Sequence, residues 1–268
     1  MAQGFASWGN DLYTGRRSYA IVGRRSRYFW VSAVLVVASI VVFLVQGFNL
    51  GIDFRGGSEF TVSGTSSVEQ QLGTDAVHSV APEEEPQVTS VGSNAVRVQT
   101  NELSNEQVEQ VKTALADAYG VSADDVASSF IGPTWGSDVS TKAIQGLIGF
   151  LILVAIVMTL YFRAWRMALA AIIALLHDLV ITAGVYALVG WEVTPATVIG
   201  FLTILGYSIY DTVVVFDKVR ENTKDVVSQS RATYGEQANL AVNQTLVRSI
   251  NTSVVALLPV ASIPRQCR

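Results

Sequence analysis

Long apolar runs dominate the pattern of this sequence. Four of them approach the roughly 20 residues that a helix needs to cross about 30 Å of hydrocarbon. They are Phe29 to Phe48, Ala143 to Phe162, Met167 to Val189 and Val193 to Phe216. The sequence therefore predicts a transmembrane helix at residues 29–48 and three more within residues 142–216. The first run is too long for the core of a signal peptide, so we interpret it as an uncleaved anchor.

A fifth apolar run is shorter and less regular. It begins after Arg248, meets Pro259 and Pro264, and ends in a polar stretch at residues 265–268. We expect a partial fifth helix over residues 248–268, cut short by a truncation or a frameshift. The polar segment before it, residues 217–247, predicts either a helix on the membrane surface or a solvated loop.

Basic residues lie on one side of the predicted helices. Five arginines precede the first helix, two more lie between the second and third helices, and further basic residues follow the fourth. By the positive-inside rule, residues 1–28 and 217–247 are cytoplasmic and residues 49–141 lie outside. The outer segment is acidic, which also suits a domain that simply has to stay soluble.

In the outer segment, alternating apolar and polar residues and turn or capping residues predict a small α+β domain. Two strand patterns flank a turn at Gly92, and Ser104 with Gln107 forms a capping box that starts a helix ending near Gly120. The predicted strands are 59–62, 87–91, 95–99 and 126–131, and the predicted helices are 68–80 and 104–120. The order βαββαβ is that of a ferredoxin-like domain.

Composition excludes several classes of protein. Of the 268 residues, 50% are hydrophobic and only 15% charged, whereas soluble domains average roughly 25% charged. With one cysteine, Cys267, and two distant histidines, His78 and His177, the sequence offers neither a disulfide nor a cysteine-based metal site. We see no nucleophile–base pair or phosphate loop, so we expect no enzymatic activity, no cofactor, no metal and no nucleic-acid partner.

Ionisable residues inside the predicted spans carry the most weight for function. An Asp at a bilayer centre costs roughly 2.5 to 3.5 kcal/mol on insertion scales. The third helix contains His177 and Asp178, and the fourth contains Asp211 with Tyr207 one turn earlier on the same face. The fifth run begins with Arg248, Asn251 and Thr252 at i, i+3 and i+4, a polar stripe that could face Asp211. Either a proton pathway or a cluster that merely fixes helix packing would explain these residues.

A glycine-rich segment follows the first helix. It contains Gly51, Gly56 and Gly57, with Asp53 and Arg55 between them. The glycines allow left-handed backbone and close approach of neighbouring segments, while the two charged residues would lie at the membrane surface. It lacks the ending of a phosphate loop. A tight turn from a helix into a strand is the simpler interpretation.

These segments together resemble the SecF family of protein-export membrane subunits. The resemblance rests on the segment 51–57, the pair His177-Asp178, the stretch GYSIYDTVVVFDKVREN at residues 206–222, and the run RSINTS at 248–253. The long stretch also contains the family-like residues Asp217, Arg220, Glu221 and Asn222. The order of these segments along the chain is that of the family.

The resemblance implies half of a transporter of the resistance-nodulation-division (RND) type, in the bacterial inner membrane. Its implied partners are a SecD-like subunit, the SecYEG channel, YajC, membrane lipid, the proton and a translocating preprotein. Asp211 matches the family's intramembrane carboxylate, and Arg248 matches the arginine of the same proton pathway. Two departures stand out: the family often has Asn where this chain has Tyr210, and it has six transmembrane helices.

Two other functions fit the residues. One is half of a proton-coupled RND-type exporter of small molecules, which would also need a partner subunit. The other is a non-transporting structural membrane protein, in which Asp178 and Asp211 would be packing residues only. Co-purification of a SecD-like partner with channel subunits would support the translocation role, and loss of small-molecule resistance on deletion would support the exporter. Asp211→Asn separates a proton role from a packing role.

Overall fold

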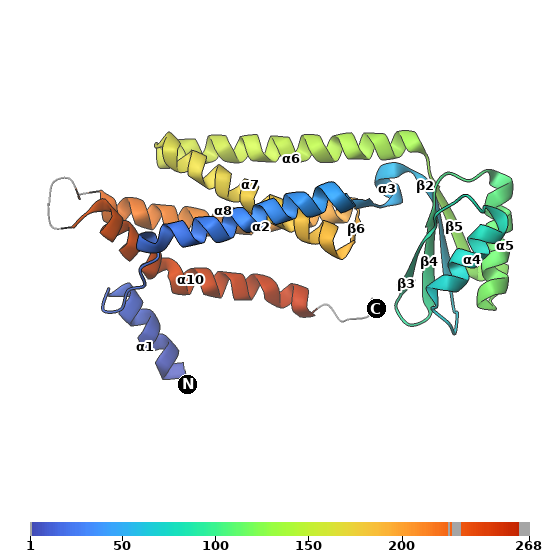
Figure 1. Ribbon diagram of the computed structural model, residues 1–268, viewed down its shortest axis with the longest axis horizontal. Coiled ribbons are helices and arrows are strands. Elements are labelled where there is room, and N and C mark those ends of the chain that lie inside the picture. The colour runs from blue at the N-terminus through green and yellow to red at the C-terminus, as the bar shows by residue number, and fades with distance from the viewer. Residues whose placement is uncertain (1, 225, 227–231, 263–268) are drawn as a thin grey trace. The chain divides into compact units, whose positions relative to one another are not determined.

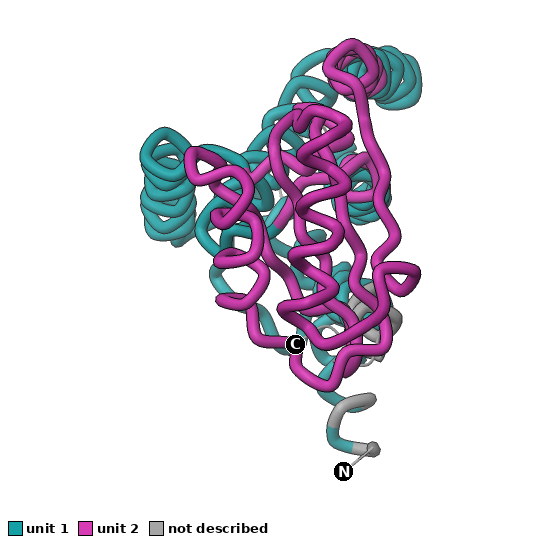
Figure 2. The backbone as a smooth tube through the Cα atoms, turned by 90° about the vertical axis from the view of Figure 1, so that its right-hand side faces the viewer, with its two compact units in different colours: residues 1–48, 147–191, 199–262 teal, residues 49–146, 192–198, 263–268 magenta. Residues whose placement is uncertain are grey.

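The chain forms long helices interrupted by one small sheet domain (Figure 1). The computed structural model describes residues 2–224, 226 and 232–262. The elements form two compact units, one of residues 1–48, 147–191 and 199–262 and one of residues 49–146 and 192–198 (Figure 2). We call the first the helical unit and the second, after the prediction that residues 49–141 lie outside, the outer unit.

Four helices are long and apolar enough to cross a membrane. They are α2 (Arg25–Gln46), α6 (Pro133–Phe162), α7 (Trp165–Val189) and α8 (Pro195–Thr223). The runs in α6 and α7 lie wholly within their helices, while the first run extends two residues beyond α2 and the last begins two residues before α8. Four such helices make the chain a membrane protein. The largest extensions beyond the runs are in α6, which starts ten residues before Ala143, and in α8, which ends seven residues after Phe216. Polar residues continue a helix once it has been nucleated, because each added residue gains a backbone hydrogen bond.

The outer unit contains a four-stranded antiparallel sheet in the order β3-β4-β2-β5. Along the chain the order is βαββαβ, as predicted, whereas assignment to the ferredoxin-like fold remains a prediction. The elements are β2 (Gly57–Ser63), α4 (Gln70–Val80), β3 (Gln87–Val91), β4 (Ala95–Thr100), α5 (Asn105–Tyr119), the short 3-10 helix η2 (Ala123–Asp125) and β5 (Val126–Ile131). The predicted capping box at Ser104 and Gln107 is present, and Gly120 ends α5 in the left-handed conformation with φ 65°.

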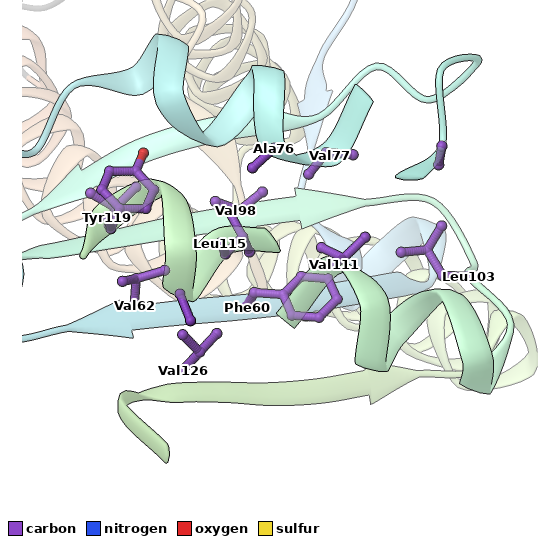
Figure 3. Packing of buried hydrophobic residues seen from close by; sticks show 13 residues of the cluster. Phe60, Val62, Ala76, Val77, Val98, Leu103, Val111, Leu115, Tyr119 and Val126 are labelled. Carbon is purple, nitrogen blue, oxygen red and sulfur yellow. The ribbon is translucent and has the colours of Figure 1, made fainter. Parts of the chain in front are cut away.

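The core of the outer unit lies between the sheet and its two helices. Phe60 and Val62, two residues apart on β2, both point toward the helices. There they contact the cluster that contains Val111 and Leu115 of α5, and all four side chains are fully buried (Figure 3). Because side chains on a strand alternate between faces, only one face of the sheet contributes to this core. The unit is thus a two-layer α/β sandwich.

In the helical unit, α2 packs along α7. The contact is close at Gly184 of α7, where an added Cβ would overlap Ser39 of α2. Near the turn between α6 and α7, Phe162 lies edge-on to Phe216 of α8 with ring centroids 6.0 Å apart. Small residues let membrane helices approach closely where there is no water to drive them together.

The N-terminal segment is held against the last helix, α10 (Tyr234–Ser262), by amide side chains. Asn243 accepts from the Tyr19 backbone N–H at 2.8 Å and donates to the Tyr19 carbonyl at 2.9 Å. Asn239 accepts from the Val22 N–H at 3.0 Å, just where the 3-10 helix η1 (Val22–Arg24) leads into α2. Leu12 of α1 (Ala2–Tyr13) is fully buried there. These bonds fix the start of α2 to α10.

One expectation about the C-terminal third was wrong. The helix that contains Arg248 is not interrupted at Pro259, because α10 continues to Ser262. A proline removes one backbone donor from a helix, a loss that membrane helices tolerate. Both ends of the polar segment 217–247 are helical, since α8 runs to Thr223 and α10 begins at Tyr234. A place at the membrane surface stays a prediction. Pro264 and the expected irregular ending lie outside the described residues.

Candidate functional site

Asp211 of α8 makes its hydrogen bond to the last helix. Its Oδ1 accepts from the Ser249 hydroxyl of α10 at 2.8 Å, and both side chains are partly buried. Sequence reasoning missed Ser249, although it directly follows Arg248. The Asp211 carboxylate therefore joins α8 to α10 through a neutral hydroxyl.

Arg248 binds the neighbour of Asp211 instead of Asp211 itself. Its Nη2 donates to the Tyr210 hydroxyl at 2.6 Å, and its guanidinium carbon lies 5.6 Å from the centroid of the same ring. Among the described residues no ion pair links Arg248 with Asp211, and a shared proton pathway of the two residues stays a prediction. Thr252 of the expected polar stripe bonds back to the Arg248 carbonyl at 3.0 Å. Arg248 binds Tyr210 because α10 is rotated so that Ser249, and not Arg248, points toward the Asp211 carboxylate.

A second carboxylate cluster joins α7 to α8. His177 Nδ1 and Asp178 Oδ1 are 3.0 Å apart, and Asp178 Oδ2 accepts a short hydrogen bond from the Ser208 hydroxyl. The other ring nitrogen of His177, Nε2, is buried without a hydrogen-bond partner among the described residues. Because Ser208 is three residues before Asp211, one turn of α8 binds both neighbouring helices.

An open cleft of about 530 Å³ reaches Arg248 within the helical unit. Tyr207 lies on its wall, as do Tyr13 of α1 and Gln244 of α10. Tyr207 and Arg248 therefore line the same cleft. The arginine side chain has open space on one side.

The glycine-rich segment is built for close backbone contact. Gly56 and Gly57 have φ values of 78° and 140°, as expected for left-handed or otherwise Gly-specific backbone. A Cβ on Gly57 would overlap the Thr100 carbonyl of β4, and one on Gly51 would meet the Glu192 carboxylate. Between them lies a single helical turn, α3 (Ile52–Arg55), in place of a simple tight turn.

A parallel pair of two-residue strands anchors the segment. β1 (Asn49–Leu50) pairs with β6 (Glu192–Val193), which precedes α8. Glu192 also accepts from buried Gln99 at 3.0 Å. Gly51 and Gly57 are thus required where the chain passes through α3 into the sheet, because a side chain at either position would meet Glu192 or Thr100.

The remaining charged residues of the two motifs have mixed surroundings. Asp53 is partly buried, and Arg55 has two buried nitrogens without a partner among the described residues. At the end of α8, Lys218 pairs with Glu221 at 2.9 Å and Asn222 donates to Gln244 of α10 at 2.9 Å. The side chains of Asp217 and Arg220 are exposed. This end of α8 is bound to α10 by an amide contact, not by its charges.

No group of three or more potential metal ligands exists in the described part of the chain. The groups that can bind and release a proton here are the carboxyls of Asp178 and Asp211 and the imidazole of His177. The guanidinium of Arg248 stays charged and acts only as a hydrogen-bond donor and a positive charge.

Comparison with known proteins decides the family. The family model of the SecD/SecF protein export membrane proteins, C-terminal, matches residues 110–264, and that of the SecD/SecF GG motif matches residues 41–68. Protein translocase subunit SecF of Streptomyces coelicolor is 46% identical over 264 residues, covering 95% of this chain and 68% of the relative. The chain belongs to the SecF family. Protein translocase subunit SecF of Mycobacterium tuberculosis is 44% identical, covering 97% of this chain and 61% of the relative.

A solved structure agrees with this SecF assignment. The crystal structure of SecDF from Thermus thermophilus superposes with a TM-score of 0.80 at 28% identity, covering 94% of this chain and 34% of that one. The SecDF sequence from the same organism is 32% identical over 245 residues. The fold is therefore that of the SecF half of a SecDF protein.

Proposed function

We propose that this chain is an auxiliary subunit of the Sec protein translocase, which uses the proton gradient to assist preprotein export across the bacterial inner membrane. Support comes from its membership of the SecF family and from relatives named as protein translocase subunits. The matched SecDF of Thermus thermophilus carries both halves in one chain. We accordingly propose a separate SecD-like subunit as the partner of this chain.

One observation carries the proposal: the carboxylate of Asp211 lies inside a candidate membrane span and bonds across to Ser249 on another helix. An ionised carboxylate accepts a stronger hydrogen bond than a neutral one. Gain or loss of a proton at Asp211 therefore changes the contact between α8 and α10. The cluster of His177, Asp178 and Ser208, one turn away on α8, supplies a second group for the same proton pathway.

The orientation and the other partners belong to the same proposal. The N-terminus is cytoplasmic and residues 49–141 are outside, with SecYEG, YajC, membrane lipid and the preprotein as further partners. No enzymatic step and no cofactor are needed. A single cysteine at Ser66 should react with an impermeant thiol reagent in intact spheroplasts, whereas one at Thr14 should not. The reverse labelling would contradict this orientation.

The decisive experiment is Asp211→Asn, which keeps the shape of the side chain but cannot ionise. Co-expressed with a SecD-like partner, the variant should insert and bind that partner, yet lose the proton-gradient-dependent stimulation of preprotein export into membrane vesicles. Asp117→Asn, at an exposed position of α5, is the matched control and should retain the stimulation. Stimulation that persists in Asp211→Asn would contradict a proton role.

The same variant addresses the competing functions. Loss of partner binding in Asp211→Asn would indicate a packing role, since removing one member of a buried polar pair costs several kcal/mol. Half of a small-molecule exporter is not favoured, because the matched relatives are protein translocase subunits.

A further inference from the structure

Arg248 and Asp211 lie on facing helices, yet each is bonded to the other's neighbour. Arg248 donates to Tyr210 at 2.6 Å and lies over its ring, while Ser249 donates to Asp211 at 2.8 Å. Adjacent residues of α8 thus bind adjacent residues of α10. Tyr210 offers both a hydroxyl acceptor and a π face, which are the two features that hold a guanidinium.

Arg248 lies close to Asp211 along the facing helices, because it bonds to the residue that directly precedes Asp211. Tyr210 and Asp211 are consecutive, and the arginine has a long side chain with several rotatable bonds. The cleft of about 530 Å³ leaves open space beside the Arg248 side chain. An ion pair with Asp211 would require a change of the Arg248 rotamer.

We propose that Tyr210 is a positioning residue that holds Arg248 away from Asp211 while the carboxyl is protonated, and releases it to Asp211 when the proton leaves. This inference rests on the proposed function and adds a residue that governs its proton site.

Charge explains why the two partners alternate. A neutral Asp211 offers the guanidinium no charge, so the tyrosine hydroxyl and ring face are the better partner. An ionised Asp211 forms a charge-assisted bond, which is stronger than a bond to a neutral hydroxyl. Tyr210 therefore competes with the carboxylate for the arginine, and favours proton uptake by Asp211.

Other titratable or charged groups lie on the elements around Asp211. They are Arg248 on α10, His177 and Asp178 on α7, Tyr13 on α1, and Tyr207, Tyr210, Asp217 and Lys218 on α8 itself. Lys218 is paired with Glu221 and lies 5.9 Å from the Tyr13 ring centroid. Asp178 is bonded to His177 and Ser208. A change at Tyr210 alone leaves all these groups in place, so a shift at Asp211 reports on Arg248.

The test is a pH titration of the Asp211 carboxyl in the full chain, reconstituted in lipid. Its protonated C=O stretch is followed by infrared difference spectroscopy and assigned by its loss in Asp211→Asn. Tyr210→Phe keeps the ring but removes the hydroxyl. We expect its midpoint to fall by about one pH unit, which is about tenfold weaker proton binding, because a nearby guanidinium stabilises the charged carboxylate.

Two further variants sharpen the result. Tyr161→Phe on α6 is the matched control, since no hydrogen bond of the Tyr161 hydroxyl exists among the described residues and its ring contact with Phe162 is preserved. It should leave the midpoint unchanged. Tyr210→Trp keeps an aromatic face but has no oxygen acceptor, so its midpoint should fall as in Tyr210→Phe.

An unchanged or raised midpoint in both Tyr210 variants would overturn the proposal, as would an Asp211 carboxyl that does not titrate in any of these proteins. The titration needs neither partner nor preprotein. A shifted midpoint with undiminished export in Asp211→Asn would therefore support the role of Tyr210 while contradicting the proposed function.

Discussion

The outer unit and the helical unit are stabilised in different ways. In the outer unit, thirteen buried residues form one continuous core against one face of the sheet. In the helical unit, α2 has no buried residue, although it packs along α7, and the main buried cluster has only four members. Water drives apolar side chains together in the outer unit, whereas lipid is as apolar as the side chains it surrounds. The helical unit depends instead on close backbone contact and polar bonds between helices.

Loss of a large core side chain in the outer unit should have the largest effect. Phe60 of β2 is fully buried, and Phe60→Ala should lower the free energy of unfolding of this unit by about 3 to 5 kcal/mol through lost burial and a cavity. Hydrogen exchange of the backbone amides of α4 and α5 in the full chain measures this loss of stability.

The control is Phe130→Ala on β5, because the Phe130 side chain is 54% exposed. It should change the stability by less than about 0.5 kcal/mol. Equal effects of the two variants would contradict a core restricted to one face of the sheet.

Close helix contact is the corresponding weak point of the helical unit. Gly184→Ala places a methyl group against Ser39 and should cost about 1 to 3 kcal/mol through overpacking. The midpoint of thermal unfolding in detergent should fall by several degrees.

Gly149→Ala on α6 provides the comparison, because nothing lies within 4 Å of an added Cβ there. It should be neutral or slightly stabilising, since Ala is the better helix former. A matching decrease in both variants would indicate a backbone effect and not the contact between α2 and α7.

A buried polar contact in the outer unit should have an intermediate effect. Tyr119 donates through its hydroxyl to the Glu69 carbonyl at 2.8 Å, and Tyr119→Phe should cost about 1 kcal/mol. Burial raises the pKa of Tyr119 above 10.0. The unfolded chain therefore ionises first, so this residue's contribution is complete below pH 10 and is lost as the pH rises further. Urea denaturation of the unmodified protein and of Tyr119→Phe at pH 9 and pH 11 measures this effect. Between the two pH values, the free energy of unfolding should decline less in Tyr119→Phe.

The smallest effect concerns the water-exposed start of α10. Glu236 accepts the Thr233 backbone N–H at 2.8 Å, and this hydrogen bond, followed by that of the Thr233 hydroxyl, lowers the pKa of Glu236 below 4.5. Its capping contribution is therefore present above pH 4.5 and lost as the pH falls through the lowered value. Glu236→Gln should remove this pH dependence from the exchange of the first amides of α10. An unaltered dependence would exclude Glu236 as its source.

The sequence alone determined the elements whose cause is local. Twenty consecutive apolar residues have no better solvent than lipid, so the four spans could be read from composition. The start of α5 at Ser104 and its end at Gly120 could also be predicted, because a capping box and a left-handed glycine act within one helical turn. The motif around Asp211 likewise identified the family.

Only the tertiary structure decided which side chains meet. Arg248 and Ser249 are neighbours in the sequence, and the rotation of α10 against α8 determines that the serine contacts Asp211 and the arginine contacts Tyr210. The approach of Glu192 to Gly51 joins residues 141 positions apart in the chain. Consecutive residues on a helix point about 100° apart, so a small rotation exchanges the partners of a polar residue while leaving its hydrophobic pattern unchanged.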